Sequence, residues 1–270
     1  MKMTVAFLIA LFLLTTRVLV AGAAIRYEQD ATPNGAATFD IPGAALTSNQ
    51  ESSYDEMLMA NGVDPGSNKA RVIVAWIRRI QHDPVIRANV HSIRRLFMDA
   101  QTRANLMADG VARLAPADRL RYARLITKFL DVLVPPDCFG MNDMSEVMSR
   151  ISLNEVADAD IDEYLQILLE ALRSSASAAP IDIPTPQQYA AAEITLGRAL
   201  ASELGNDKAN LTRYEAYMAN PKRATPTEAC WGLRVTMHAI LAMPEPDRDI
   251  VLRYVVTPRS AQVTPSPRRP

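Results

Sequence analysis

Residues 225–242 read TPTEACWGLRVTMHAILA, and this stretch contains the signals that decide the fold. It opens with Thr225 and Pro226, and Glu228 stands three positions after the threonine. A threonine cap accepts a hydrogen bond from the backbone N–H of the third helical residue, whose side chain reaches back to the cap. Proline suits the first helical position because its missing N–H would have no partner there. The pattern predicts a helix over residues 226–242.

The same start signals recur along the chain. Thr185, Pro186 and Gln188 repeat the capping arrangement, and Asp83 precedes Pro84. No stretch shows convincing alternation of β-branched residues, and aromatic residues make up only 6 % of the chain. We therefore expect an all-α protein, an irregular array of about nine or ten helices. The helices are expected near residues 52–60, 68–81, 84–108, 116–133, 143–150, 158–174, 186–204, 207–218, 226–242 and 246–255.

Composition divides the chain into four parts. Residues 24–50 show no sustained periodicity and are interpreted as a flexible arm. The helical domain is expected over 51–256, with a possible boundary between two lobes at 174–184, which reads SSASAAPIDIP. Residues 257–270 contain four prolines and three arginines and are interpreted as a disordered tail.

The first 23 residues resemble a secretory signal peptide. Lys2 gives a short positive start, an apolar run of 11 residues follows, and AGA at 21–23 offers small residues for cleavage after Ala23. The alternative is an uncleaved inner-membrane anchor over residues 3–24, although Arg17 leaves the apolar run shorter than the roughly 20 residues of a membrane span. We expect an exported protein, periplasmic or secreted, with no stable membrane span if the signal is cleaved.

The only two cysteines, Cys138 and Cys230, occur in the similar stretches CFGM and CWGL. In an oxidising compartment a disulfide between them is reasonable, and we predict it. In the alternative interpretation Cys230 is a small buried residue on the same helical face as Leu233 and Met237. Gly232, inside the expected helix, predicts a close crossing by another segment, for which the Cys138 segment is the candidate.

No motif identifies a catalytic centre. The three histidines, His82, His91 and His238, lack the spacing of a metal site, so no metal and no cofactor are predicted. Catalytic residues stay unknown, because paired carboxylates of the kind that a hydrolase or lyase uses have no recognisable spacing in an acidic helical chain.

Charge is segregated along the sequence. Residues 68–128 contain 13 basic and four acidic residues, whereas residues 129–172 contain one basic and ten acidic residues. In one interpretation these segments pack together and their charges pair or face water. In the other, the arginine-rich helices display an anion-binding surface. The candidate surface combines five arginines of residues 78–95 with a face of the helix at 226–242: Arg78, Arg79, Arg87, Arg94, Arg95, Trp231, Arg234 and His238.

These observations favour an exported helical binding or interaction protein without catalytic activity, such as an inhibitor or immunity-like partner of another envelope protein. Its partner is expected to be an unknown protein or an anionic envelope component. The net charge of -1 gives no reason to expect nucleic-acid binding. The alternatives are a cell-envelope hydrolase or lyase that uses paired carboxylates, and a membrane-anchored structural protein.

Overall fold

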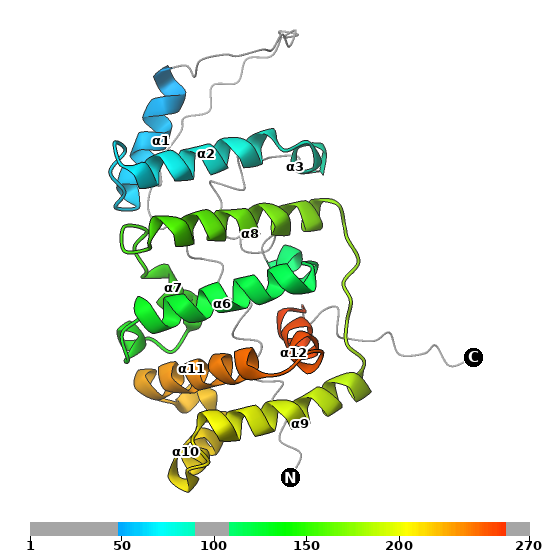
Figure 1. The fold of residues 1–270 in the computed structure, drawn as a ribbon. Helices are drawn as coiled ribbons and strands as arrows, with labels where there is room; N and C mark the ends of the chain where they lie inside the picture. The colour runs from blue at the N-terminus through cyan, green and yellow to red at the C-terminus, as the bar shows by residue number, and fades with distance from the viewer. Residues whose placement is uncertain (1–47, 90–107, 258–270) are drawn as a thin grey trace, which may run out of the picture.

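The computed structural model describes residues 48–89 and 108–257 (Figure 1). Within these residues every regular element is helical and none is a strand, so the expected all-α class is confirmed. The α-helices are α1 (Ser48–Ala60), α2 (Asn68–His82), α3 (Pro84–Asn89), α6 (Pro116–Val132), α7 (Met144–Ser149), α8 (Asp158–Ala176), α9 (Pro186–Glu203), α10 (Lys208–Ala219), α11 (Pro226–Ala242) and α12 (Asp247–Val256).

The expected and observed helices agree closely where they can be compared. The helix expected over 226–242 has those bounds, whereas α1 begins at Ser48 rather than at residue 52. The signal peptide, most of the arm and most of the tail fall outside the described residues. Most of the helix expected over 84–108 falls there as well, together with Arg94 and Arg95.

The helices form a stack in which α8 lies between α2 and α6 (Figure 1). α11 packs on the other side of α6, and α9 packs on both α11 and α12 at the far end of the stack. One main core runs through this arrangement and includes Leu58 of α1, Leu169 of α8, Ile240 of α11 and Val251 of α12. The core therefore includes residues from both sides of the 174–184 segment. A lobe boundary at this segment stays a prediction.

Helix starts are held by the predicted caps. The hydroxyl and backbone of Thr185 exchange hydrogen bonds with Gln188, which completes the capping box of α9. Asp83 is buried, and its Oδ1 accepts hydrogen bonds from the N–H groups of Val85 and Ile86 at the start of α3. Its Oδ2 accepts a 2.7 Å hydrogen bond from Arg173 near the end of α8. Asp83 therefore caps one helix and joins it to another.

Two glycines mark places where helices approach closely. Gly110 lies within the helical residues 108–112, and a Cβ there would lie 2.2 Å from the carbonyl oxygen of Ala171. Close approach to α8 therefore requires the glycine. The close crossing expected at Gly232 is present, since a Cβ there would lie 2.3 Å from the ring of Tyr217. The crossing segment is α10, not the segment that carries Cys138.

Replacing Gly232 with alanine should destabilise the protein. The new methyl group would collide with the buried ring of Tyr217, and overpacking of this kind costs about 1–3 kcal/mol. Gly197→Ala is the matched control because, in the described part of the chain, a Cβ at Gly197 meets nothing within 4 Å, and alanine favours a helix by up to about 1 kcal/mol. Urea denaturation should show a lower free energy of unfolding for Gly232→Ala and an unchanged or higher one for Gly197→Ala. A stabilising Gly232→Ala would contradict the close crossing.

Candidate functional site

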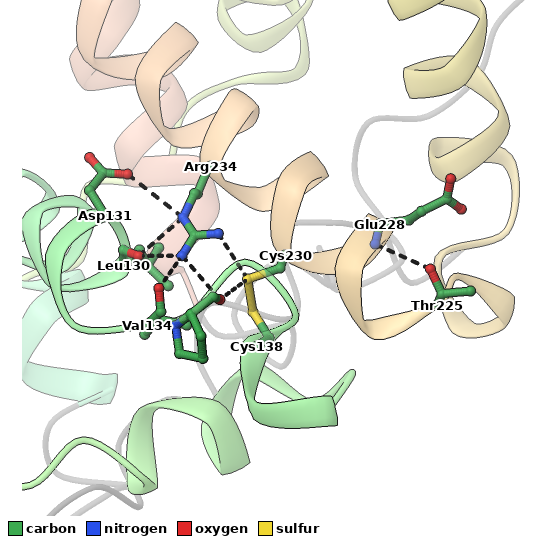
Figure 2. Close-up of a disulfide and its surroundings, with 9 residues drawn as sticks. Leu130, Asp131, Val134, Cys138, Thr225, Glu228, Cys230 and Arg234 are labelled. Atoms are coloured by element: carbon green, nitrogen blue, oxygen red, sulfur yellow. Dashed lines mark hydrogen bonds and ion pairs between the residues drawn. A yellow bond between two sulfur atoms is a disulfide. The ribbon is translucent and has the colours of Figure 1, made fainter.

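Cys138 and Cys230 are joined, with their Sγ atoms 2.11 Å apart (Figure 2). Cys138 lies in the single turn η3 (Cys138–Gly140), and Cys230 lies in the second turn of α11. Both residues are fully buried. The predicted pairing is thus present, and it connects the loop after α6 to a helix that begins 88 residues beyond that cysteine, at Pro226.

The turn that presents Cys138 has an uncommon backbone. Cys138 and Phe139 have φ values of 50° and 56°, and Gly140 follows with 75°. The left-handed region costs a residue other than glycine roughly 1–2 kcal/mol. The disulfide at Cys138 and the hydrogen bond from its N–H to the carbonyl of Pro135 hold the turn in place. As a result Phe139 points partly into solvent, with 37 % of its surface exposed.

Arg234 of α11 lies beside the disulfide and closes the end of α6 (Figure 2). Its guanidinium donates 2.6 Å hydrogen bonds to the backbone carbonyls of Leu130 and Val134, and Nη1 lies 3.1 Å from Sγ of Cys230. The last carbonyls of a helix have no partner within the helix, so they need donors from elsewhere. Burial lowers the pKa of Arg234, with nearby Asp131 acting in the opposite direction. The guanidinium of Arg234 therefore forms its hydrogen bonds within the protein.

Replacing Arg234 with methionine should lower the free energy of unfolding by about 2–3 kcal/mol, because several carbonyls at the end of α6 would lose their donor. Arg124→Met removes the same charge from an exposed position on α6 and should change stability by less than about 0.5 kcal/mol. Chemical denaturation of both variants checks this expectation. Equal losses in the two variants would show that the carbonyl contacts contribute little.

His238 lies between two carboxylates from different helices. Its Nε2 is 2.9 Å from Asp131 of α6, and its Nδ1 is 3.0 Å from Glu203 of α9. Only the protonated ring can donate from both nitrogens. Partial burial lowers the pKa of His238, but the hydrogen bonds to Asp131 and Glu203 outweigh it, so the pKa lies above its ordinary value. His238 thus joins α6, α9 and α11 as a charged bridge.

The bridge should make stability depend on pH. Because the pKa is raised in the folded protein, the stabilisation is fully present below the unfolded value of about 6.5 and is lost as pH rises through the folded value. His238→Gln should therefore destabilise the protein more at about pH 5.5 than at about pH 8.5. The control is His82→Gln, since His82 faces the backbone carbonyl of Arg78. Denaturation curves that show the same gap at both pH values for His238→Gln would refute the bridge.

Trp231 is half-buried, and one of its faces is covered. The guanidinium of Arg213 lies 4.0 Å from the ring centroid, and Tyr214 packs edge-on at 6.1 Å. Arg213 also pairs with Glu228 near the start of α11, at 3.5 Å. Trp231 therefore packs against the small second cluster, where α10 packs on α11.

The arginines on α2 and α3 of the candidate surface are exposed, unlike Arg234. Arg78, Arg79 and Arg87 are exposed, and Arg79 extends over the ring of Trp76 at 4.7 Å. Arg71, which the sequence analysis missed, is exposed seven residues before Arg78, so both lie on one side of α2. We call Arg71, Arg78, Arg79 and Arg87 the basic face. Within the described part of the chain none of the four forms an ion pair with a carboxylate.

Most other basic residues in the described part of the 68–128 segment do pair. Lys128 lies 2.7 Å from Asp160, and Arg121 lies 3.4 Å from Glu163, so α6 pairs with the acidic start of α8. On the opposite side of α8, Lys69 donates to three backbone carbonyls of residues 153–156, and Trp76 donates to Asp162 at 2.6 Å. Charge pairing on both sides of α8 thus accounts for much of the segregation, and the basic face is the largest group of unpaired arginines among the described residues.

The candidate residues therefore form two separate groups. The basic face lies at one end of the stack, and Trp231, Arg234 and His238 lie on α11, beyond α8 and α6 (Figure 1). Among the described side chains no group of histidine, cysteine, aspartate and glutamate is arranged to hold a metal ion. At His238 the two carboxylates bind opposite ring nitrogens, so neither nitrogen is left to accept a proton from a nucleophile.

Comparison of the chain with protein-family models, with curated proteins and with solved structures gave no match. In the described ranges no helix is both long enough and apolar enough to cross a membrane.

Proposed function

We propose that this chain is an exported helical interaction protein that docks an acidic partner protein through the basic face. The observation that carries the proposal is the contrast between this face and the rest of the 68–128 segment. In the described part of that segment three other arginines pair with carboxylates of the fold, as in Arg113 with Asp109 and Arg119 with Asp249, and only Arg124 of α6 is also exposed without such a partner. Four exposed arginines on α2 and α3 keep their charge available to a partner.

The disulfide supports the exported location. Disulfides persist in oxidising compartments and are rare in reducing ones. Cys138 and Cys230 close a loop with a sequence separation of 92 residues, which corresponds to about 4.6 kcal/mol of loop-closure entropy. A chain that depends on such a bond is suited to the compartment that the expected signal peptide would direct it to.

Arginine chemistry favours a carboxylate-rich partner. The guanidinium presents a planar fork of donors that matches a carboxylate in two places at once. Arg71 and Arg78 are separated by two turns on one side of α2, so they can contact an acidic segment at two points. An inhibitor or immunity-like partner of an acidic envelope protein would use such a surface, and charge complementarity would steer the encounter.

A protein partner fits this face better than a lipid surface. A helix that lies on a membrane inserts an apolar face between lipid head groups. The apolar side of α2, which includes Ile73, Ile77 and Ile80, is buried in the core. The large exposed apolar residues of the described chain lie elsewhere: Met59, Val132, Phe139, Ile183 and Ile194.

Binding of fluorescently labelled poly-L-glutamate tests the proposal with a defined acidic probe. Wild-type protein should bind it, and the affinity should fall steeply between about 50 and 300 mM NaCl because salt screens exposed charges. The triple variant Arg71→Gln, Arg78→Gln, Arg87→Gln should lose most of the affinity. The matched control, Arg124→Gln, Arg150→Gln, Lys208→Gln, removes the same number of exposed charges and should bind as wild type does.

The outcomes separate a specific face from bulk charge and from lipid. Equal loss of binding in the two triple variants would mean that net charge alone drives binding, and the proposal would fail. It would also fail if vesicles of phosphatidylglycerol bound the wild type through the same three arginines while poly-L-glutamate did not. The proposal would be supported if loss of the arginines at positions 71, 78 and 87 weakened binding to poly-L-glutamate and the wild type did not bind the vesicles.

A further inference from the structure

The outer side of α9 carries an apolar face centred on Ile194. Ala190, Ile194, Gly197 and Ala201 follow one another at helical spacing, and the side chain of Ile194 is 60 % exposed. Tyr189, Ala192 and Leu196, on the other side of the helix, are buried in the core. We call the outer set the Ile194 face.

The Ile194 face is shaped for close approach by another helix. Among the described residues, a Cβ placed on Gly197 would meet no atom within 4 Å, so no described side chain covers it. The order Ala190, Ile194, Gly197, Ala201 alternates steps of four and three residues, which is the spacing of a two-helix seam. Small residues on both sides of Ile194 would let a second backbone come near, and Ile194 would fill the space between the two helices.

Two unpaired charges flank this face, one on each side. Glu193 immediately precedes Ile194, and Arg198 immediately follows Gly197. In the described residues neither side chain forms an ion pair or a hydrogen bond. Five positions separate them, which is the separation of the charges that pair between the helices of a parallel two-stranded seam.

The positions of these two charges determine which orientation suits a pair of α9 helices from two copies of this chain. In a parallel pair of α9 helices, Glu193 of one copy faces Arg198 of the other, and the two-fold symmetry forms this ion pair twice. In an antiparallel pair each flank would face the same flank of the other copy, so these opposite charges would not meet. The face is therefore complementary to itself in the parallel arrangement.

We infer that two copies of this protein associate through a parallel pairing of α9, with Ile194 at the centre and the Glu193–Arg198 ion pairs at the sides. One helix face buries less surface than the roughly 1,200–2,000 Å² of a stable interface, so the dimer is weak and favoured by high concentration. α9 and α2 lie at opposite ends of the stack (Figure 1), so pairing would leave the basic face of each copy open. This inference does not depend on the proposed function.

Sedimentation equilibrium over a wide concentration series tests the pairing with charge-reversal variants. Wild type should show a monomer–dimer equilibrium. Glu193→Arg alone and Arg198→Glu alone should each weaken it about tenfold or more, since like charges would then meet twice. The double variant Glu193→Arg, Arg198→Glu should restore association, because the pairs are rebuilt with their signs exchanged. Arg223→Glu, at an exposed position away from α9, is the control and should associate as wild type does.

A cysteine at the centre of the face tests whether the two faces meet there. In a parallel pair Ile194 meets Ile194 of the second copy, so Ile194→Cys should form a covalent dimer under mild oxidation. Ile194→Arg should abolish the dimer without unfolding the protein, which circular dichroism would verify. A wild type that stays monomeric at every concentration, a double variant that fails to restore the dimer, or an Ile194→Cys variant that does not cross-link would overturn the inference.

Discussion

The junction between the end of α6 and the first turns of α11 is the contact on which the two halves of the molecule depend. Cys138 is bonded to Cys230, and Arg234, one turn further along α11, donates to the carbonyls of Leu130 and Val134. A covalent bond and a set of charge-assisted hydrogen bonds therefore hold the same two segments. Because α9 and α12 in turn pack on α11 and α6, the position of the whole C-terminal half follows from this junction.

Charge plays two roles in this chain, and position in the stack separates them. Around α8 the basic and acidic segments neutralise each other, as Lys128 does with Asp160 and Arg121 with Glu163. On the outer side of α2 no acidic helix lies opposite in the described residues, so the arginines stay exposed. A sequence with a net charge near zero thus presents a local positive surface, which net charge alone would hide.

Local features were predictable from sequence and contacts between distant helices were not. The caps at Thr185 and Asp83 act within three residues of themselves, so the helix starts could be inferred. The role of Gly110 could not be predicted because it depends on Ala171, 61 positions away. Arg234 and His238 were correctly placed on one helix, but their partners come from α6 and α9, whose packing no local pattern encodes. Arg71 could have been found from its seven-residue spacing to Arg78.

The disulfide determines what would happen if the connection between α8 and α9 were cut. This extended segment, residues 177–185, runs along the outside of the stack (Figure 1) and includes Ile183, which is 39 % exposed. It lies inside the loop that Cys138 and Cys230 close. A protease that cut it would therefore produce two fragments that stay covalently joined and still share the main core. Cleavage there would appear only on a reducing gel, and the nicked protein would remain one molecule in an oxidising compartment.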